Sequence, residues 1–248
     1  MTQTFPSPKD GPAPHLRGLI LVIFMYGWMA LMGLACLPYV LVSPRAGAIW
    51  SVRNYCRIVR VATRLICGLR TEIRGPVPRG EALIAAKHQS FLDIIMLVSV
   101  LPAPRFVMKR SLLWAPVLGW YARKIGCVAV ERGAKGKALK GMVQETASDK
   151  VPGQLVIYPQ GTRVAPGAKV SYKIGVAALA DALEAPVIPV AVNGGLFWPR
   201  SGILRRPGLA VVEFLPEIPS GLPRAELMAR LETQIETASD RLMEEALG

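Results

Sequence analysis

The chain has 248 residues and a formal net charge of +13, and 52% of its residues are hydrophobic, giving a mean hydropathy of +0.35. This length is enough to bury one sizeable core, so we expect one folded domain with an N-terminal appendage. The charge requires an anionic partner, such as nucleic acid, anionic lipid or a phosphorylated substrate. Because only 7% of residues are aromatic and no basic–aromatic pattern occurs, an anionic membrane surface is favoured over a nucleic acid.

Cysteine and histidine usage argues against disulfide and metal chemistry. The chain has only two histidines, and its four cysteines show neither paired nor metal-like spacing. These cysteines are Cys36, Cys56, Cys67 and Cys127. We therefore expect reduced, structural cysteines and no metal site.

The N-terminal region carries the clearest architectural signal. Residues 1–15 are rich in proline and are expected to be flexible, whereas residues 18–42 contain no charged side chain. This apolar run exceeds the ~20 residues that a helix needs to cross a bilayer, and the roughly 7–15 apolar residues of a secretory signal. Pro38 and the pair Ser43-Pro44 interrupt the run. A single span and a re-entrant helical hairpin both fit, and Pro38 favours the hairpin.

A basic segment follows the apolar run and completes a membrane-anchoring region that we assign to residues 16–68. Arg53, Arg57, Arg60 and Arg64 recur at helical spacing among apolar residues. This pattern is typical of a basic amphipathic helix in the membrane interface, although a solvated charge stripe on a soluble helix is the alternative. Arginines on this flank also place it in the cytoplasm by the positive-inside rule. We therefore expect an N-terminal membrane-associated helical pair.

From residue 69 onward, short apolar runs alternate with longer helix-like stretches. The expected strands are Leu69 to Arg74, Ala82 to Ala86, Cys127 to Glu131, Gln154 to Tyr158, Val187 to Val192 and Ala210 to Leu215. The expected helices are Leu92 to Leu101, Ser111 to Lys124, Lys135 to Asp149, Val176 to Leu183 and Arg224 to Leu247. The alternation predicts a layered α/β domain over residues 69–248, with a largely parallel, mixed sheet and a C-terminal amphipathic helix.

His88 is the first candidate for chemistry, since it follows the apolar run 82–86 and precedes Asp93 by five residues. Histidine accepts a proton near neutral pH, and a carboxylate on its other ring nitrogen would fix the tautomer. A satisfied structural histidine is the alternative. Ser90 and Asp93 also match a helix capping box, which is compatible with either interpretation. Because five helical residues would turn the pair about 140° apart, they meet only if His88 lies in a loop and Asp93 in the helix.

A second candidate motif is the turn from Tyr158 to Arg163, which ends an expected strand. The segment Pro159-Gln160-Gly161 turns sharply and exposes backbone N–H groups, and Arg163 offers a fork for phosphate or carboxylate. A plain turn with a surface arginine is the alternative.

Two further strand ends are weaker signals. The segment 126–132 reads as a strand ending in Glu131-Arg132, which could bring another cation to the strand ends, and 187–193 reads as a buried strand. Lys109 and Lys173 are additional cations near these elements, and each is more often solvated than functional.

Taken in this order, the four motifs are far more specific than any one of them. The chain resembles the glycerolipid acyltransferases typified by 1-acylglycerol-3-phosphate acyltransferase. Residues 88–93, 126–132, 158–163 and 187–192 carry the resemblance, which covers roughly residues 65–215. The basic, apolar N-terminus matches the membrane-attached bacterial members of that family.

The resemblance implies transfer of a fatty acyl group from acyl carrier protein or coenzyme A to the sn-2 hydroxyl of lysophosphatidic acid. The product would be phosphatidic acid, at the cytoplasmic face of the bacterial inner membrane, and no bound cofactor is implied. His88 would be the general base and Asp93 its orienter. The implied substrate-binding residues are Arg163, Gly161, Thr162, Arg132 and Lys109, with Arg163 on the acceptor phosphate.

The sequence departs from the family pattern in two motifs. Lys87 stands where asparagine is usual, and Tyr158 and Gln160 stand where phenylalanine and glutamate are usual. Gln160 keeps the hydrogen-bonding reach but drops a charge, which removes a neighbour that would compete for Arg163.

No serine or cysteine is marked as a nucleophile by an adjacent base, so we expect direct attack of the lipid hydroxyl on the thioester. The turn amides at Gly161 are candidate donors to the tetrahedral oxyanion. Two alternatives stay open. One is the same chemistry on another lyso-lipid, such as a lysophospholipid or lyso-ornithine lipid. The other is a non-catalytic membrane-surface relative, which Gln160 and the large positive charge would suit.

Overall fold

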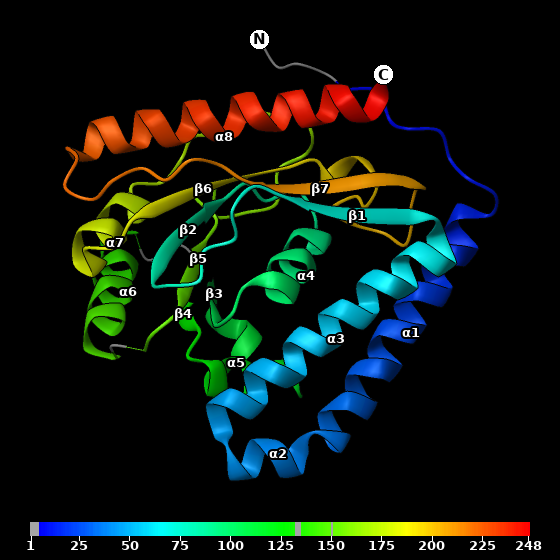
Figure 1. Cartoon of the computed structure of the whole chain (residues 1–248), viewed down its shortest axis with the longest axis horizontal. Coiled ribbons are helices and arrows are strands. Elements are labelled where there is room, and N and C mark those ends of the chain that lie inside the picture. Colours follow the sequence, from blue (N-terminus) through cyan, green and yellow to red (C-terminus); the bar gives the residue numbers. More distant parts are fainter. Residues whose placement is uncertain (1–4, 132–134, 150) are drawn as a thin grey trace.

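A seven-stranded mixed sheet forms the centre of the computed structural model, which describes residues 5–131, 135–149 and 151–248, with only the backbone at 135–138 and 147–149. The strand order is β1-β7-β6-β2-β5-β3-β4 (Figure 1). The strands are β1 Leu69–Arg74, β2 Ala82–Ala86, β3 Pro104–Lys109, β4 Val128–Val130, β5 Gln154–Ile157, β6 Val187–Val192 and β7 Gly208–Phe214. The five strands from β6 to β4 run parallel to one another, and the β7–β1 pair runs antiparallel to them. The largely parallel, mixed sheet predicted from the sequence is therefore confirmed.

Helices cover both faces of this sheet. They are α4 Phe91–Val100, α5 Leu118–Ile125, α6 Lys135–Asp149, α7 Gly175–Leu183 and α8 Arg224–Leu247, with the 3₁₀ helices η1 Arg110–Trp114 and η2 Gly194–Leu196. Alternate residues of β2 point to opposite faces: Ile84 packs in the core cluster with α4, and Leu83 in the cluster with α7 and α8. All five residues of β2 are buried, as expected for a central parallel strand.

The N-terminal region is a helical hairpin. Helices α1 (Pro14–Ala35) and α3 (Pro44–Cys67) lie side by side, and the short α2 (Leu37–Val42) turns the chain between them (Figure 1). Pro38 and Pro44 occupy the first turns of α2 and α3, where proline is tolerated, so each starts a new helix after a break. Helix α1 is long and apolar enough to cross a membrane, by length and composition.

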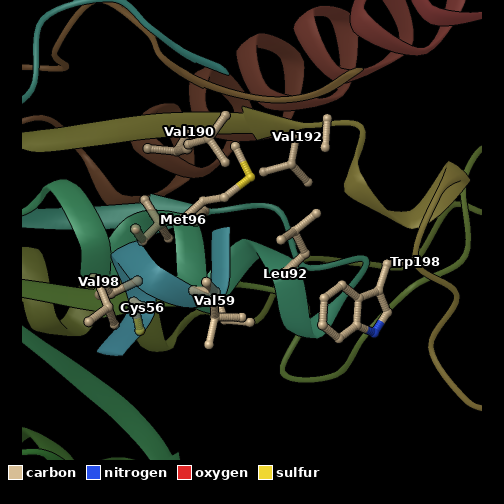
Figure 2. Packing of buried hydrophobic residues seen from close by; sticks show 14 of the residues in the cluster. Cys56, Val59, Leu92, Met96, Val98, Val190, Val192 and Trp198 are labelled. Carbon is tan, nitrogen blue, oxygen red and sulfur yellow. The ribbon is translucent and has the colours of Figure 1, made fainter. Parts of the chain in front are cut away.

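Helix α3 joins this hairpin to the sheet domain through a shared apolar core. Cys56 and Val59 of α3 pack against Met96 and Val98 of α4, with Val190 of β6 on the far side (Figure 2). Helix α4 is thus buried between the hairpin and the sheet. The hairpin and the sheet domain share a core and are expected to move as one body.

Part of the arginine stripe of α3 contacts the sheet domain. Arg60 donates to Thr71 Oγ1 at 2.9 Å and to Ser99 Oγ at 2.9 Å, and Arg57 donates to the Ser99 carbonyl at 3.2 Å. Arg57 and Arg60 therefore link α3 to β1 and α4, whereas Arg64 of the same stripe is exposed.

Between residues 102 and 125 the structure contains one strand that was not predicted and divides one helix that was. The sequence predicts no strand here, yet Pro104 begins β3, which pairs in parallel with β5. The expected helix from Ser111 to Lys124 is divided into η1 and α5. Pro116 lies at the break, where the missing N–H and the restricted preceding residue prevent one continuous helix.

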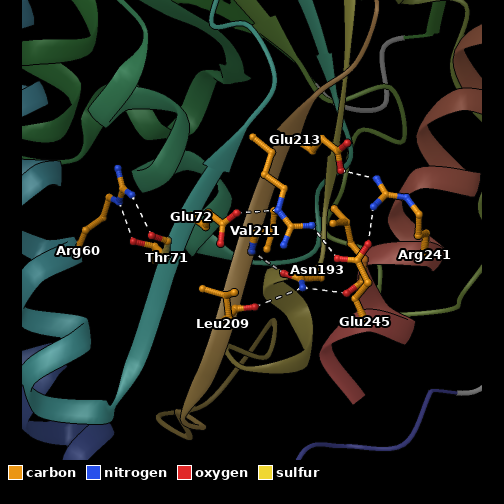
Figure 3. A network of polar contacts seen from close by, with 11 residues as sticks. Arg60, Thr71, Glu72, Asn193, Leu209, Val211, Glu213, Arg241 and Glu245 are labelled. Atoms are coloured by element: carbon orange, nitrogen blue, oxygen red, sulfur yellow. Dashed lines mark hydrogen bonds and ion pairs between the residues drawn. The ribbon is translucent and has the colours of Figure 1, made fainter. Parts of the chain in front are cut away.

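Helix α8 closes the opposite face of the domain, and polar contacts fasten its C-terminal half (Figure 3). Glu245 bonds to Arg74 of β1 at 2.6 Å and also contacts Arg241, which in turn reaches Glu213 of β7. Asn193, after β6, accepts from the Val211 amide at 2.7 Å and donates to the Leu242 carbonyl at 3.1 Å. The end of β6 is thereby tied to both β7 and α8.

Candidate active site

Three of the four predicted motifs lie side by side at one edge of the sheet. The carboxyl ends of β2, β5 and β6 lead into His88, Tyr158 and Asn193, and parallel neighbours place these ends on the same edge. Ligand sites of open α/β sheets lie outside this edge. The backbone reinforces the arrangement, since the Lys87 amide donates to the Val190 carbonyl at 2.9 Å and the Val164 amide donates to the His88 carbonyl at 2.8 Å.

His88 and Asp93 are in contact, with His88 in the loop and Asp93 in the first turn of α4. His88 Nδ1 lies 3.2 Å from Asp93 Oδ2. The same oxygen accepts the backbone amides of Gln89 and Ser90, each at 2.7 Å, and Ser90 Oγ accepts the Leu92 amide at 3.1 Å. The capping box and the contact with His88 therefore coexist on one carboxylate.

The contact leaves the other ring nitrogen of His88 available for chemistry. A carboxylate beside Nδ1 favours the tautomer with the proton on Nδ1, which makes Nε2 the proton acceptor. The Asp93 side chain is only 1% exposed and that of His88 is 11% exposed. A Cβ at Gly194 would lie 2.8 Å from Asp93 Oδ1, so glycine at this position lets η2 approach the carboxylate closely.

Tyr158 packs flat on the imidazole of His88. Their ring centroids are 3.9 Å apart with 17° between the ring planes, and Phe106 stacks on Tyr158 from β3 at 6.4 Å. Burial raises the pKa of the Tyr158 phenol well above its usual value, and the negative charge of Asp93 raises it further. The phenol therefore stays neutral and serves as a wall of the site that fixes the ring of His88.

Sequence reasoning missed the two side chains that flank His88. Lys87 is fully buried and forms an ion pair with Glu236 of α8, whose other carboxylate oxygen accepts the Tyr172 hydroxyl at 2.8 Å. Gln89 Oε1 accepts the Gly195 amide at 3.1 Å. The only signal in the sequence was a lysine beside an apolar strand, which does not reveal its partner 149 positions away.

The turn after β5 bears on the expected oxyanion donors. Gly161 has φ of 67°, in the left-handed region, and its amide donates to the Tyr158 carbonyl at 2.8 Å. This amide closes the turn and is thus committed within the chain rather than held ready for an oxyanion. Gln160 is buried, and neither its side-chain oxygen nor its nitrogen has a hydrogen-bond partner in the described parts of the chain.

The predicted cations are distributed around this edge. Arg163 is partly exposed and donates to the Arg200 carbonyl at 2.8 Å, and Thr162 beside it is partly exposed. Lys109 is exposed at the end of β3, which β5 separates from β2. Arg132 lies outside the described residues. The structure thus unites His88 with Asp93 and the turn, and it places Lys109 further along the edge.

A histidine held by a buried carboxylate at the carboxyl edge of a mixed sheet is an arrangement suited to acid–base chemistry in an α/β enzyme. A family model described as Acyltransferase matches residues 69–193, which include every motif at this edge. The chain belongs to this acyltransferase family.

Several named proteins are similar to the chain. A 1-acyl-sn-glycerol-3-phosphate acyltransferase of Pseudomonas aeruginosa is 32% identical over 196 residues, covering 78% of this chain and 74% of the relative. A human 1-acyl-sn-glycerol-3-phosphate acyltransferase alpha is 25% identical, covering 84% and 75%. The crystal structure of the 1-acyl-sn-glycerophosphate (LPA) acyltransferase from Thermotoga maritima shares the fold, with a TM-score of 0.75 at 20% identity, covering 92% and 95%.

Proposed function

We propose that this enzyme transfers a fatty acyl group from an acyl carrier protein or coenzyme A thioester to the sn-2 hydroxyl of 1-acyl-sn-glycerol-3-phosphate. The product is phosphatidic acid, a precursor in phospholipid biosynthesis. The observation that carries the proposal is the 3.2 Å contact between His88 Nδ1 and Asp93 Oδ2, which leaves Nε2 as a base. The names of the similar proteins supply the substrate.

His88 would remove the proton of the lipid hydroxyl as its oxygen attacks the thioester carbonyl. The resulting tetrahedral intermediate collapses by breaking the C–S bond, and the departing thiolate takes the proton back from His88. Asp93 stabilises the imidazolium between these two transfers. Because the hydroxyl attacks directly, the scheme uses no acyl-enzyme, metal or bound cofactor.

The acceptor phosphate is assigned to the cations at the sheet edge. Arg163 presents its guanidinium beside the turn of Gly161 and Thr162, and bidentate arginine–phosphate pairing suits a phosphate monoester. Lys109 is assigned to the outer part of the same substrate site, and Arg132 stays a candidate from the sequence alone. The net charge of +13 would draw anionic acceptors and an anionic membrane surface towards the protein.

Membrane attachment is assigned to the hairpin within residues 16–68, at the cytoplasmic face of a bacterial inner membrane. Its outer surface is strongly apolar: Ile23 is 64% exposed, Leu34 72%, Leu41 67% and Val42 86%. A contiguous apolar surface of this kind is covered by lipid or by protein in the cell. Because the chain reverses at α2, we assign the hairpin to one leaflet.

The proposed function is tested by release of free thiol from an acyl thioester, with and without 1-acyl-sn-glycerol-3-phosphate. We expect His88→Ala to lower turnover by at least ~10²-fold, the usual size of a general-base contribution. His15→Ala is the matched control, since His15 is the other histidine and lies exposed on α1. Near-normal turnover of purified His88→Ala would contradict the assignment. Separate assays with acyl carrier protein and coenzyme A thioesters identify the donor.

A second acceptor class has support of its own. The lysophospholipid acyltransferase LPEAT1 of Arabidopsis thaliana is 34% identical over 123 residues, covering 47% of this chain and 30% of that protein. The same base chemistry would serve a lysophospholipid whose phosphate is a diester. Competition between the two acceptors for one thioester donor decides between them. If the diester has the higher kcat/KM, it becomes the proposed acceptor in place of the phosphate monoester.

A further inference from the structure

The segment between β3 and α5 exposes large apolar side chains that the proposed chemistry does not use. We call residues 110–118 the apolar loop. Within it, Trp114 is 81% exposed, and Leu112 and Leu118 are each 42% exposed. We propose that the apolar loop docks into the lipid bilayer as a second membrane contact beside the helical hairpin.

The apolar loop is attached to the tip end of the hairpin. Val117 lies so close to Gly33 of α1 that a Cβ at Gly33 would be 3.0 Å from Val117 Cγ1. Tyr121 Oη, in the following helix α5, donates to the Gly33 carbonyl at 3.3 Å. In Figure 1, α5 lies beside the first half of α3, towards α2. Leu41 and Val42 of α2 are strongly exposed at this same end, so the two apolar surfaces are neighbours.

Cations accompany the exposed tryptophan. The Arg123 guanidinium lies 5.8 Å from the centroid of the Trp114 ring, and Lys124 Nζ lies 5.7 Å from that of Trp120. Arg110 is half-exposed and has Glu131 at 3.7 Å as its acidic neighbour. Tryptophan beside lysine and arginine is the composition that membrane interfaces favour, because the ring sits at headgroup level and the cations meet anionic lipid.

These features favour a bilayer over an acidic protein partner. The loop exposes Trp114 more strongly than Arg110, and it exposes Leu112 and Leu118 as well, whereas an acidic surface would be met mainly by charges. The patch also adjoins the apolar hairpin. The loop follows directly from β3, whose carboxyl end lies at the edge of the sheet that carries His88. Docking of the loop therefore sets the height of this edge above the headgroups. Only the effect of docking on acceptor access rests on the proposed function, namely on the acceptor being a lipid.

The test uses the full chain with vesicles of phosphatidylcholine and phosphatidylglycerol whose phosphatidylcholine carries brominated acyl chains. Bromine quenches tryptophan within the bilayer. We expect wild-type fluorescence to be quenched more strongly than that of Trp114→Phe, because Trp114 contributes a lipid-buried component. Trp198→Phe is the matched control, since Trp198 is 3% exposed and packs inside the protein. Equal quenching of wild type and Trp114→Phe would overturn the proposal.

A second variant separates docking from catalysis. In Leu112→Asn/Leu118→Asn, both changes lie on the surface, and circular dichroism checks the fold. We expect the quenching of Trp114 to fall and the KM for acceptor presented in vesicles to rise about tenfold, equivalent to about 1.4 kcal/mol of binding. Activity on a short-chain, monomeric lyso-lipid should be unchanged. An equal loss on the monomeric acceptor would assign the loop to the site and overturn the docking.

Two other outcomes are distinguishable. If Trp114 escapes bromine quenching but is shielded from a soluble quencher by acyl carrier protein, the loop binds that acidic protein and the bilayer proposal is wrong. If no acceptor supports acyl transfer while Trp114 is still quenched, the proposed function fails and the membrane contact stands.

Discussion

Lys87 and Glu236 form a buried ion pair that joins the residue before His88 to helix α8. The Lys87 side chain is fully buried and that of Glu236 is 19% exposed. Tyr172 donates to the same carboxylate at 2.8 Å, so the pair also reaches the segment after the β5 turn. Three elements distant in sequence thus meet at one carboxylate, directly behind the candidate base.

Breaking this pair from one side should destabilise the protein. In Lys87→Met, Glu236 loses its cation inside the protein, and we expect the free energy of unfolding to fall by about 3 kcal/mol. The double variant Lys87→Met/Glu236→Met removes both charges and should recover most of that loss, since apolar replacement of a whole buried pair is often neutral. Urea unfolding followed by circular dichroism measures both. A double variant as unstable as Lys87→Met would show that the ion pair itself is needed.

Neutralising the Asp93 carboxylate should lower turnover by more than the loss of a helix cap would. Asp93→Asn keeps the shape of the side chain but removes the charge that stabilises an imidazolium and can reverse the favoured His88 tautomer, so we expect at least a ~10²-fold lower kcat. Ser90→Ala is the control, because it removes the other half of the capping box and should cost about 1 kcal/mol of stability with little change in kcat. Equal effects of Asp93→Asn and Ser90→Ala on kcat would mean that Asp93 acts only as a helix cap.

Contacts between residues close in sequence at the centre of the site could be predicted, whereas contacts between residues distant in sequence could not. The contact of His88 with Asp93 spans five residues and follows from a strand, a loop and a capping box. The pairing of Lys87 with Glu236 depends on how α8 crosses the sheet, which no local pattern encodes. The missed strand at Pro104–Lys109 shows the same limit, since proline argues locally against a strand that an apolar neighbour, β5, stabilises.

Arg163 should act on acceptor binding rather than on the chemical step. Its guanidinium is partly exposed and already held by the Arg200 carbonyl, so it is oriented without an acidic partner among the described residues. We expect Arg163→Ala to raise the KM for a phosphate acceptor by roughly 10–100-fold with a smaller change in kcat. Arg163→Lys keeps the positive charge but loses the forked guanidinium. Its KM for the acceptor should therefore lie between those of the wild type and Arg163→Ala. A loss in kcat alone, at unchanged KM, would remove Arg163 from the phosphate site.

Stability should fall in mildly alkaline solution because of Cys127. Burial raises the pKa of its thiol to about 11, so the native state keeps a proton that the unfolded chain releases above pH ~9. The native state then binds more protons, and the free energy of unfolding decreases between about pH 9 and 11, at most by ~1.4 kcal/mol per pH unit for this group. Urea unfolding at pH 8, 9, 10 and 11 should show a shallower decrease in Cys127→Ala. Parallel curves would exclude the thiol as a source.

Gln160 offers a test of whether the bound acceptor contacts the buried amide in the turn after β5. Its amide is buried with neither oxygen nor nitrogen bonded in the parts of the chain that the structure describes, and an unmet buried polar group costs about 1–3 kcal/mol. We expect Gln160→Met, which keeps the shape, to raise the free energy of unfolding by about 1 kcal/mol. If the acceptor hydroxyls or phosphate meet this amide, the same change should raise KM about tenfold, for a loss of about 1.4 kcal/mol.

Gln234→Met is the matched control for this experiment. Gln234 lies on α8, away from the motifs at the carboxyl edge, and its side-chain oxygen is likewise buried without a hydrogen-bond partner in the described parts of the chain. Its replacement should raise stability without changing KM. A rise in KM for Gln160→Met alone would place the acceptor against Gln160. Equal KM values for wild type and Gln160→Met would show that the acceptor does not contact Gln160. A fall in the stability of Gln160→Met would mean that the Gln160 amide is bonded in the native protein.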